Sequence, residues 1–328
     1  MNLFSEKDVI GEAHGKIILV GEHAVVYGKK AIAIPFPLKI RAQIMKNSGE
    51  ITISSLLYTG TLDGIPKEMK GISECIKKTL ELIDKPFKDL SIKFISEIPM
   101  GRGLGSSAAL ATAIGRGIFS FFDKEISQEE LFFIVQLAEA YSHGKPSGID
   151  MMAVASDSPI LFSKQEGARS IKVPVPFYIV IADTGRVGDT KAAVEQVKKT
   201  QLLEPNRINK VINRIEEITE EANNAIIRGD VITLGHLLSK NHEELKALGV
   251  SDKLLDGLVE KAIRAGALGA KLTGGGMGGC MIALAKDSKD AKNITKELIK
   301  EGAIKVWYFS TDSEVLYTPS MANEGEIS

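Results

Sequence analysis

A glycine- and serine-rich run between positions 99 and 109 has the residue types and spacing of an anion-binding loop. The residues before it alternate between apolar and polar and predict a strand, and those after it predict a helix to about residue 122. A helix N-terminus offers unpaired N–H groups and a positive dipole end, and glycine allows close approach of the backbone. The run therefore predicts a phosphate-binding loop, with an ordinary serine-capped glycine turn as the alternative. The predicted loop consists of Pro99, Met100, Gly101, Arg102, Gly103, Leu104, Gly105, Ser106, Ser107, Ala108 and Ala109.

The same run also fits the glycine pattern of dinucleotide-binding folds, with Gly103, Gly105 and Ala108 at the required spacing. That interpretation needs a second strand after the helix, carrying an acidic residue for the ribose. Ser127 and Glu130 instead form a capping box, which predicts that another helix starts there. An NAD-dependent dehydrogenase is therefore the less favoured alternative, and the sequence contains no Walker motif.

Five further residues stand where a titratable side chain could act. Lys16 precedes a short apolar run that predicts a buried strand, and Glu22 and His23 follow it. Glu139 lies beside the apolar stripe of the helix that starts at the capping box. Near the negative end of that helix a carboxylate is mildly unfavourable, which favours a compensating cation such as Mg²⁺. Asp150 follows a loop rich in glycine and proline, where it could equally cap a helix.

These segments resemble motifs of the GHMP kinase superfamily. Residues 99–109 match its central motif Pro-x-x-x-Gly-Leu-Gly-Ser-Ser-Ala, and residues 271–279 resemble its third, Lys-Leu-Thr-Gly-x-Gly-x-Gly-Gly. Residues 15–28 look like the N-terminal motif of the mevalonate kinase branch, without the Thr-Asp with which galactokinases continue after Gly-Glu-His. Residues 143–150 resemble the segment of that branch that carries its catalytic aspartate, and the glutamate eleven residues earlier matches its Mg²⁺ ligand.

The resemblance implies a role for each candidate residue. Loop 99–109 would wrap the phosphates of ATP, and Ser106 and Glu139 would bind Mg²⁺. Asp150 would accept or orient the proton of the acceptor hydroxyl, and Lys16 would stabilise the developing charge. The residues implied to lie near the acceptor are Glu22, His23, Thr190, Gly274, Gly275 and Gly276.

The implied reaction is ATP-dependent phosphorylation of the C5 hydroxyl of mevalonate to 5-phosphomevalonate, a step of isoprenoid synthesis. A GHMP kinase that acts on phosphomevalonate or homoserine is an alternative. A phosphorylated acceptor should require an additional Arg or Lys near its site, and the Glu22-His23-Ala24 stretch offers none. A nucleotide-binding module without activity should have lost Lys16 or Asp150, and both are present.

The length of 328 residues predicts about two domains, and the change in pattern around Pro174 places their boundary between residues 174 and 175. Domain 1–174 would hold the phosphate loop, and domain 175–328 the glycine-rich loop 274–279. The resemblance implies an α+β fold, with a first domain like ribosomal protein S5 domain 2 and a ferredoxin-like second domain. ATP and mevalonate would lie in the cleft between them.

Composition and charge narrow the class of partner. A net charge of −1 gives no reason to expect a nucleic acid or a membrane surface as partner. No apolar run approaches the roughly 20 residues of a membrane span, and the first residues lack the apolar centre of a signal peptide. The two cysteines stand far apart, so a reducing cytoplasm is expected. The residues leave the oligomeric state open, with a homodimer as one possibility.

Overall fold

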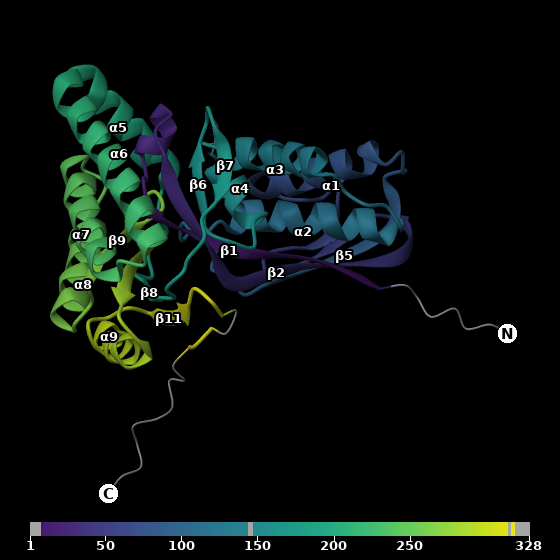
Figure 1. Cartoon of the computed structure of the whole chain (residues 1–328). Helices are drawn as coiled ribbons and strands as arrows, with labels where there is room; N and C mark the ends of the chain where they lie inside the picture. The colour runs from purple at the N-terminus through teal and green to yellow at the C-terminus, as the bar shows by residue number, and fades with distance from the viewer. Residues whose placement is uncertain (1–7, 144–146, 314–315, 319–328) are drawn as a thin grey trace, which may run out of the picture. The chain divides into compact units, whose positions relative to one another are not determined.

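The computed structural model of the chain describes residues 8–143, 147–313 and 316–318, without the side chains of Ser142 and His143. The chain forms two compact units, each built from both helices and strands (Figure 1). The first contains the residues up to Ile18 and those from His23 to Ser170. The second contains Leu19–Glu22 and the residues from Ile171 onward. The main division thus falls four residues before the boundary expected from the proline-rich segment, and a short piece near the N-terminus joins the second unit.

The first unit is built on a seven-stranded sheet with the order β4-β3-β5-β2-β6-β7, and β1 also pairs with β2. Buried and partly exposed residues alternate along the long strand β2, so one face of this strand meets the core. β2 and β5 pair antiparallel, with Ile44 opposite Ile92. The strands are β1 (Val9–Val20), β2 (Ala31–Glu50), β3 (Thr52–Ser54), β4 (Thr59–Thr61), β5 (Lys88–Ser96), β6 (Ile160–Ser163) and β7 (Gly167–Ser170).

Helices α1, α2 and α3 lie on the same side of this sheet (Figure 1). Glycines bring α2 close to β1: a Cβ on Gly11 would lie 2.1 Å from the carbonyl oxygen of Ala113 and 2.3 Å from the amide nitrogen of Gly117. The predicted capping box is confirmed, because the Ser127 N–H donates to Glu130 at 2.8 Å and the Glu130 N–H to Ser127 Oγ at 3.2 Å. The helices of this unit are η1 (Ala24–Tyr27), η2 (Lys67–Met69), α1 (Lys70–Leu82), α2 (Ser106–Phe121), α3 (Gln128–His143) and α4 (Ile149–Val154).

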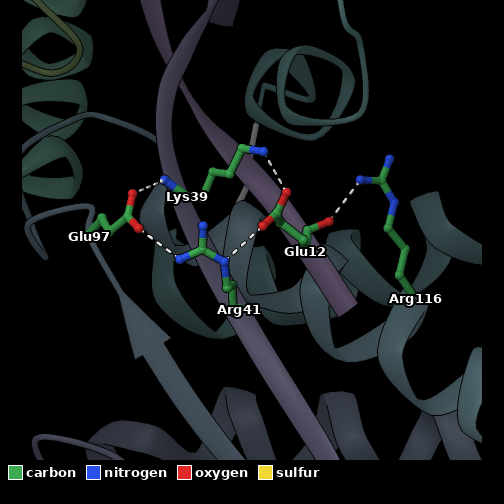
Figure 2. Close-up of polar contacts among 5 residues, drawn as sticks. All are labelled: Glu12, Lys39, Arg41, Glu97 and Arg116. Atoms are coloured by element: carbon green, nitrogen blue, oxygen red, sulfur yellow. Dashed lines mark hydrogen bonds and ion pairs between the residues drawn. The ribbon is translucent and has the colours of Figure 1, made fainter. Parts of the chain in front are cut away.

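A network of charged side chains fixes β1 against its neighbours (Figure 2). The carboxylate of Glu12 accepts from Lys39 at 2.6 Å and from Arg41 at 2.8 Å, and Arg41 also donates to Glu97 at 2.7 Å. Arg116 of α2 donates to the main-chain carbonyl of Glu12 at 2.9 Å. Single exposed ion pairs stabilise little, but this network ties β1 to both β2 and α2. β1 is thereby held in register next to the helix that follows the phosphate loop.

The second unit is built on a four-stranded antiparallel sheet with the order β11-β8-β10-β9. In chain order within the unit this is 4-1-3-2, the arrangement of a ferredoxin-like fold, so the expected mixed α+β architecture is confirmed. Long helices follow β8, and in Figure 1 they lie beside this sheet. The elements are β8 (Tyr178–Asp183), α5 (Thr190–Leu203), α6 (Pro205–Arg228), α7 (Val231–Ala247), α8 (Lys253–Arg264), β9 (Gly269–Thr273), β10 (Cys280–Ala285), α9 (Ser288–Lys300) and β11 (Lys305–Ser310).

Among the described residues, no helix has the length and apolar character needed to cross a membrane.

Candidate active site

The glycine-rich run forms the turn that leads from β5 into α2. Gly101, Gly103 and Gly105 have φ angles of 67°, 77° and 77°, in the left-handed region that other residues rarely adopt. Gly105 is the N-cap of α2, and no side chain caps the helix there. The first turn of α2 therefore presents backbone N–H groups and the positive end of its dipole, as a phosphate site requires. Leu104 and Ala108 are buried and anchor the loop to the core.

Lys16 is joined to this loop by both its main chain and its side chain. Its N–H donates to the carbonyl of Leu104 at 3.0 Å, and its Nζ donates to the carbonyl of Gly103 at 3.0 Å. A Cβ on Gly105 would lie 2.7 Å from Cγ of Lys16, so the glycine also leaves room for the lysine stem. Nζ lies 3.0 Å from Oδ1 of Asp150, while the two side chains are 2% and 27% exposed. The structure thus brings together the ammonium, the carboxylate and the loop that the sequence singled out.

Asp150 lies in the first turn of α4, whose N-cap is Gly148. The N-cap position is therefore taken by a glycine, and Asp150, two residues further on, is not the N-cap residue of this helix. The preceding residues 144–146 and the side chain of His143 lie outside the described residues.

Glu139 is a buried carboxylate near the same two residues. It is only 4% exposed, and burial first and the charge of Asp150 second raise its pKa to about 7. A hydrogen bond with Ser107 and the charge of Lys16 act in the opposite direction. Oε1 of Glu139 is buried and has no hydrogen-bond partner among the described residues. Two nearby carboxylates, one of them with an unpartnered oxygen, form an electrostatic environment that would stabilise a cation.

These side chains suit Mg²⁺, which takes some of its ligands from substrate phosphates, better than they suit a metal that the protein must coordinate alone. Within the described residues, no group of three or more His, Cys, Asp or Glu side chains could hold a metal ion. Mg²⁺ in kinases is typically bound by one or two carboxylates together with substrate phosphates and water. A single buried glutamate next to serine hydroxyls and a phosphate loop is therefore sufficient on the protein side.

The second unit contains its own glycine loop, between β9 and β10. Gly276 has a φ of 78°, and a Cβ there would lie 2.0 Å from the carbonyl oxygen of Val250. A Cβ on Gly275 would lie 2.5 Å from Oγ1 of Thr190, the first residue of α5. The N–H of Gly279 donates to the carbonyl of Arg186 at 2.8 Å. The structure therefore places Thr190 directly against the loop that contains Gly274, Gly275 and Gly276.

Glu22 and His23 lie in the turn that follows β1, which ends at Val20. His23 is 5% exposed and has a φ of 61°, which is unusual for a residue with a side chain. Glu22 is 1% exposed and forms an ion pair with Lys271 of β9. Glu22 therefore has a buried protein partner that the sequence did not indicate, and its expected contact with the acceptor remains a prediction.

Comparisons with known proteins agree with this geometry. Residues 70–157 match the GHMP kinases N terminal domain, and residues 207–304 match the GHMP kinases C terminal domain. A mevalonate kinase of Pyrococcus abyssi is 36% identical over 300 residues, which cover 84% of this chain and 88% of that protein. The chain belongs to the GHMP kinase family, within its mevalonate kinases.

Solved structures of the same family share the whole fold of this GHMP kinase. The L. major mevalonate kinase in complex with R-mevalonate has a TM-score of 0.80 at 26% identity, over 94% of this chain and 98% of that one. The Methanococcus jannaschii mevalonate kinase has a TM-score of 0.79 at 28% identity, over 93% and 98%. The dehydrogenase alternative is not supported, because α3 stands where its second strand would be.

Two features of this GHMP kinase were not evident in its sequence. Ser107, rather than Ser106, forms the hydrogen bond with Glu139. Lys271 is the first residue of the third motif, residues 271–279, but a lysine among apolar strand residues gives no sign of its partner. A lysine within an expected buried strand indicates that a partner of opposite charge lies nearby, since a buried charge needs one. The sequence alone does not tell which carboxylate supplies it.

Proposed function

We propose that this GHMP kinase transfers the γ-phosphoryl group of ATP to the C5 hydroxyl of mevalonate, giving ADP and 5-phosphomevalonate. The observation that carries the proposal is the position of Lys16 Nζ, within 3.0 Å of both Asp150 and the phosphate loop. The names of its relatives and the R-mevalonate bound to the L. major structure support the choice of acceptor.

The chemistry asks the protein mainly to align the reactants and to neutralise charge. The N–H groups of loop 99–109 and the start of α2 bind the β- and γ-phosphates. The residues that would hold Mg²⁺ are Glu139 and a serine hydroxyl, for which the sequence favours Ser106 and the contact with Glu139 favours Ser107. When bound, Mg²⁺ neutralises phosphate charge and orients the γ-phosphoryl group.

Asp150 and Lys16 act on the reacting groups. The Asp150 carboxylate is 27% exposed, so an acceptor hydroxyl can reach it and pass its proton to it. The hydroxyl oxygen then forms a bond to the γ-phosphorus while the bond from that phosphorus to the β–γ bridging oxygen breaks, and ADP leaves. The ammonium of Lys16 is already oriented by Gly103 and Asp150, so it stabilises the developing negative charge without having to reorganise.

The acceptor site is proposed to include His23, Thr190 and the loop with Gly274, Gly275 and Gly276. Thr190 packs directly against this loop, since Gly275 has no room for a side chain beside Thr190. Mevalonate needs one cation for its carboxylate and hydrogen-bond partners for two hydroxyls. Glu22, ion-paired and 1% exposed, would support this site from behind.

An assay of ADP release tests the proposal. The purified chain is mixed with ATP, Mg²⁺ and one of four alcohols: mevalonate, 5-phosphomevalonate, galactose or homoserine. We expect kcat/KM for mevalonate to exceed the others by at least about 100-fold, a discrimination available where an additional phosphate charge or a missing hydrogen-bond partner is left uncompensated. A reaction without acceptor measures background hydrolysis. Comparable use of another alcohol would refute the acceptor assignment, while the absence of turnover with all four would refute the kinase proposal.

A further inference from the structure

A buried ion pair in the second unit joins two of the sequence motifs. Lys271 and Glu22 are 249 residues apart in the chain, and their side chains are 0% and 1% exposed. Glu22 belongs to the Gly-Glu-His motif, where residues 19–22 fold with the second unit. Lys271 opens the segment that ends in glycine loop 274–279. Burial lowers the pKa of Lys271, and the charge and hydrogen bond of Glu22 oppose this shift.

Lys271 also holds the strand from which it projects. Its Nζ donates to the main-chain carbonyl of Leu272 at 2.6 Å. Side chains alternate along a strand, and the neighbouring Ala270 lines a cavity together with residues of α7 and α8. Lys271 therefore points to the opposite face of β9, where it meets Glu22. The ammonium thus binds both Glu22, in the turn that follows β1, and the last part of β9.

The N–H group of Leu272 is held as well as its carbonyl. Its N–H donates to Nδ1 of His242 at 3.4 Å, and Nε2 of His242 lies 3.2 Å from Asp256. Burial lowers the pKa of His242 to about 4, so near neutral pH the ring is uncharged and its Nδ1 can accept. Both polar groups of the Leu272 backbone are therefore held, two residues before Gly274.

Stability alone does not account for a pair buried this deeply. Removing two charges from water costs about as much as their attraction returns, so an apolar pair of similar volume is often equally stable. Unlike an apolar contact, the ion pair fixes both the direction and the distance between the Lys271 and Glu22 side chains. It does so next to a strained backbone position, because His23, the residue after Glu22, has a φ of 61°. Such conformations persist only where the surroundings enforce them.

We propose that Lys271 and Glu22 are positioning residues, whose ion pair sets the Gly-Glu-His turn and the glycine loop in the geometry that the acceptor requires. Neither side chain needs to touch substrate for this role. The inference rests on the proposed function. It is therefore tested with whichever alcohol of the four-alcohol panel the wild-type chain phosphorylates, so that a wrong acceptor does not decide it.

The most informative variant is Glu22→Asp, which keeps the charge and withdraws the carboxylate by one methylene. We expect kcat/KM for the acceptor to fall by about 10- to 100-fold, the usual consequence of a misplacement near 1 Å. The Kd for ATP, measured by equilibrium dialysis, should stay within about twofold, because the phosphate loop belongs to the other unit and is not altered. An unchanged kcat/KM would overturn the proposal, and so would an equal loss of ATP binding.

A double variant separates positioning from stability. Lys271→Met alone leaves a buried carboxylate without its partner and should lower Tm, whereas Lys271→Met with Glu22→Met should recover most of that loss. We expect the recovered double variant to keep the low kcat/KM for the acceptor. Wild-type kinetics in the double variant would show that the pair is only structural. Lys261→Met removes a more exposed ion pair of the same unit, with Glu297 at 3.0 Å, and should leave both kinetics and ATP binding unchanged.

Discussion

Replacing Glu139 by glutamine should stabilise the protein in the absence of metal and nucleotide, although it removes a side chain of the active site. The Glu139 carboxylate is buried beside Asp150, and its pKa is raised from 4.5 to about 7. At pH 8 it is ionised in an environment that disfavours the charge. Glutamine has nearly the same shape and no charge, and its amide can still pair with the Ser107 hydroxyl.

The size and sign of the effect on stability follow from the difference in the protonation of Glu139 between the folded and unfolded states. Between pH 4.5 and 7 the folded chain holds a proton on Glu139 that the unfolded chain has released, so stability falls as the pH rises through this window. At about 1.4 kcal/mol per pH unit, the full effect on the free energy of unfolding is on the order of 3 kcal/mol. Glu139→Gln should remove this part of the pH dependence.

Calorimetry of the metal-free protein in EDTA measures this directly at pH 5 and pH 8. The single tryptophan, Trp307, lies in the second unit, so its fluorescence would not report on unfolding of the unit that contains Glu139. We expect the Tm of Glu139→Gln to exceed that of the wild type at pH 8 by several degrees, and the two to converge at pH 5, where Glu139 is protonated in the folded state. A variant that is less stable than the wild type at pH 8 would refute the argument.

Metal dependence should change in the opposite direction. A hard cation prefers a charged oxygen, so Glu139→Gln should raise the Mg²⁺ concentration for half-maximal rate at least about tenfold. In the wild type, proton and cation compete for the same carboxylate. The Mg²⁺ requirement should therefore rise as the pH falls below about 7 and be nearly flat above it, whereas the variant should lack this dependence. If both proteins showed the same Mg²⁺ requirement at every pH, the metal site would lie elsewhere.

Three further substitutions test single elements of the site. Asp150→Asn should lower kcat roughly 100-fold or more, with little change in the Kd for ATP by dialysis, because it removes the proton acceptor; near wild-type kcat would exclude that role. Gly105→Ala should raise the KM for ATP at least about tenfold, because the φ of Gly105 is 77° and the new Cβ would meet Lys16. Gly28→Ala is the control: Gly28 has a φ of 83°, but the space around its Cβ is open, so this variant should have only the cost of backbone strain. Ser127→Ala should lower the free energy of unfolding by about 1 kcal/mol through loss of the helix cap, and lower Tm by roughly 2–4 °C without changing kcat. An unchanged Tm in calorimetry would contradict the capping argument.

The sequence was sufficient to predict those parts of the site that local rules determine. Three glycines with positive φ, followed by a helix with no side-chain cap, are encoded within residues 101–106, and the structure has them there. The capping box at Ser127 is equally local. The resemblance to GHMP kinases then supplied the roles of Lys16 and Asp150, which no spacing between residues so far apart could have indicated.

What the sequence could not supply depends on packing between distant segments. Successive residues of a helix point about 100° apart, so only the position of α3 decides that Ser107 contacts Glu139. The ion pair between Glu22 and Lys271 spans 249 residues, and its two partners meet because residues 19–22 fold with the second unit. Composition and periodicity contain no information about such a pairing.

The attachment of Lys16 to both the phosphate loop and Asp150 couples the two measurements on the Asp150→Asn variant. An ammonium that is 2% exposed has lost most of its hydration, and the Asp150 carboxylate and the Gly103 carbonyl replace it. Replacing the Asp150 carboxylate by an amide removes the charge that pairs with the ammonium, so the loop itself can shift. A fall in kcat in Asp150→Asn therefore identifies the proton acceptor only if the Kd for ATP is unchanged. If ATP binding weakens as well, part of the lost rate comes from the loop, because Lys16 connects the two groups.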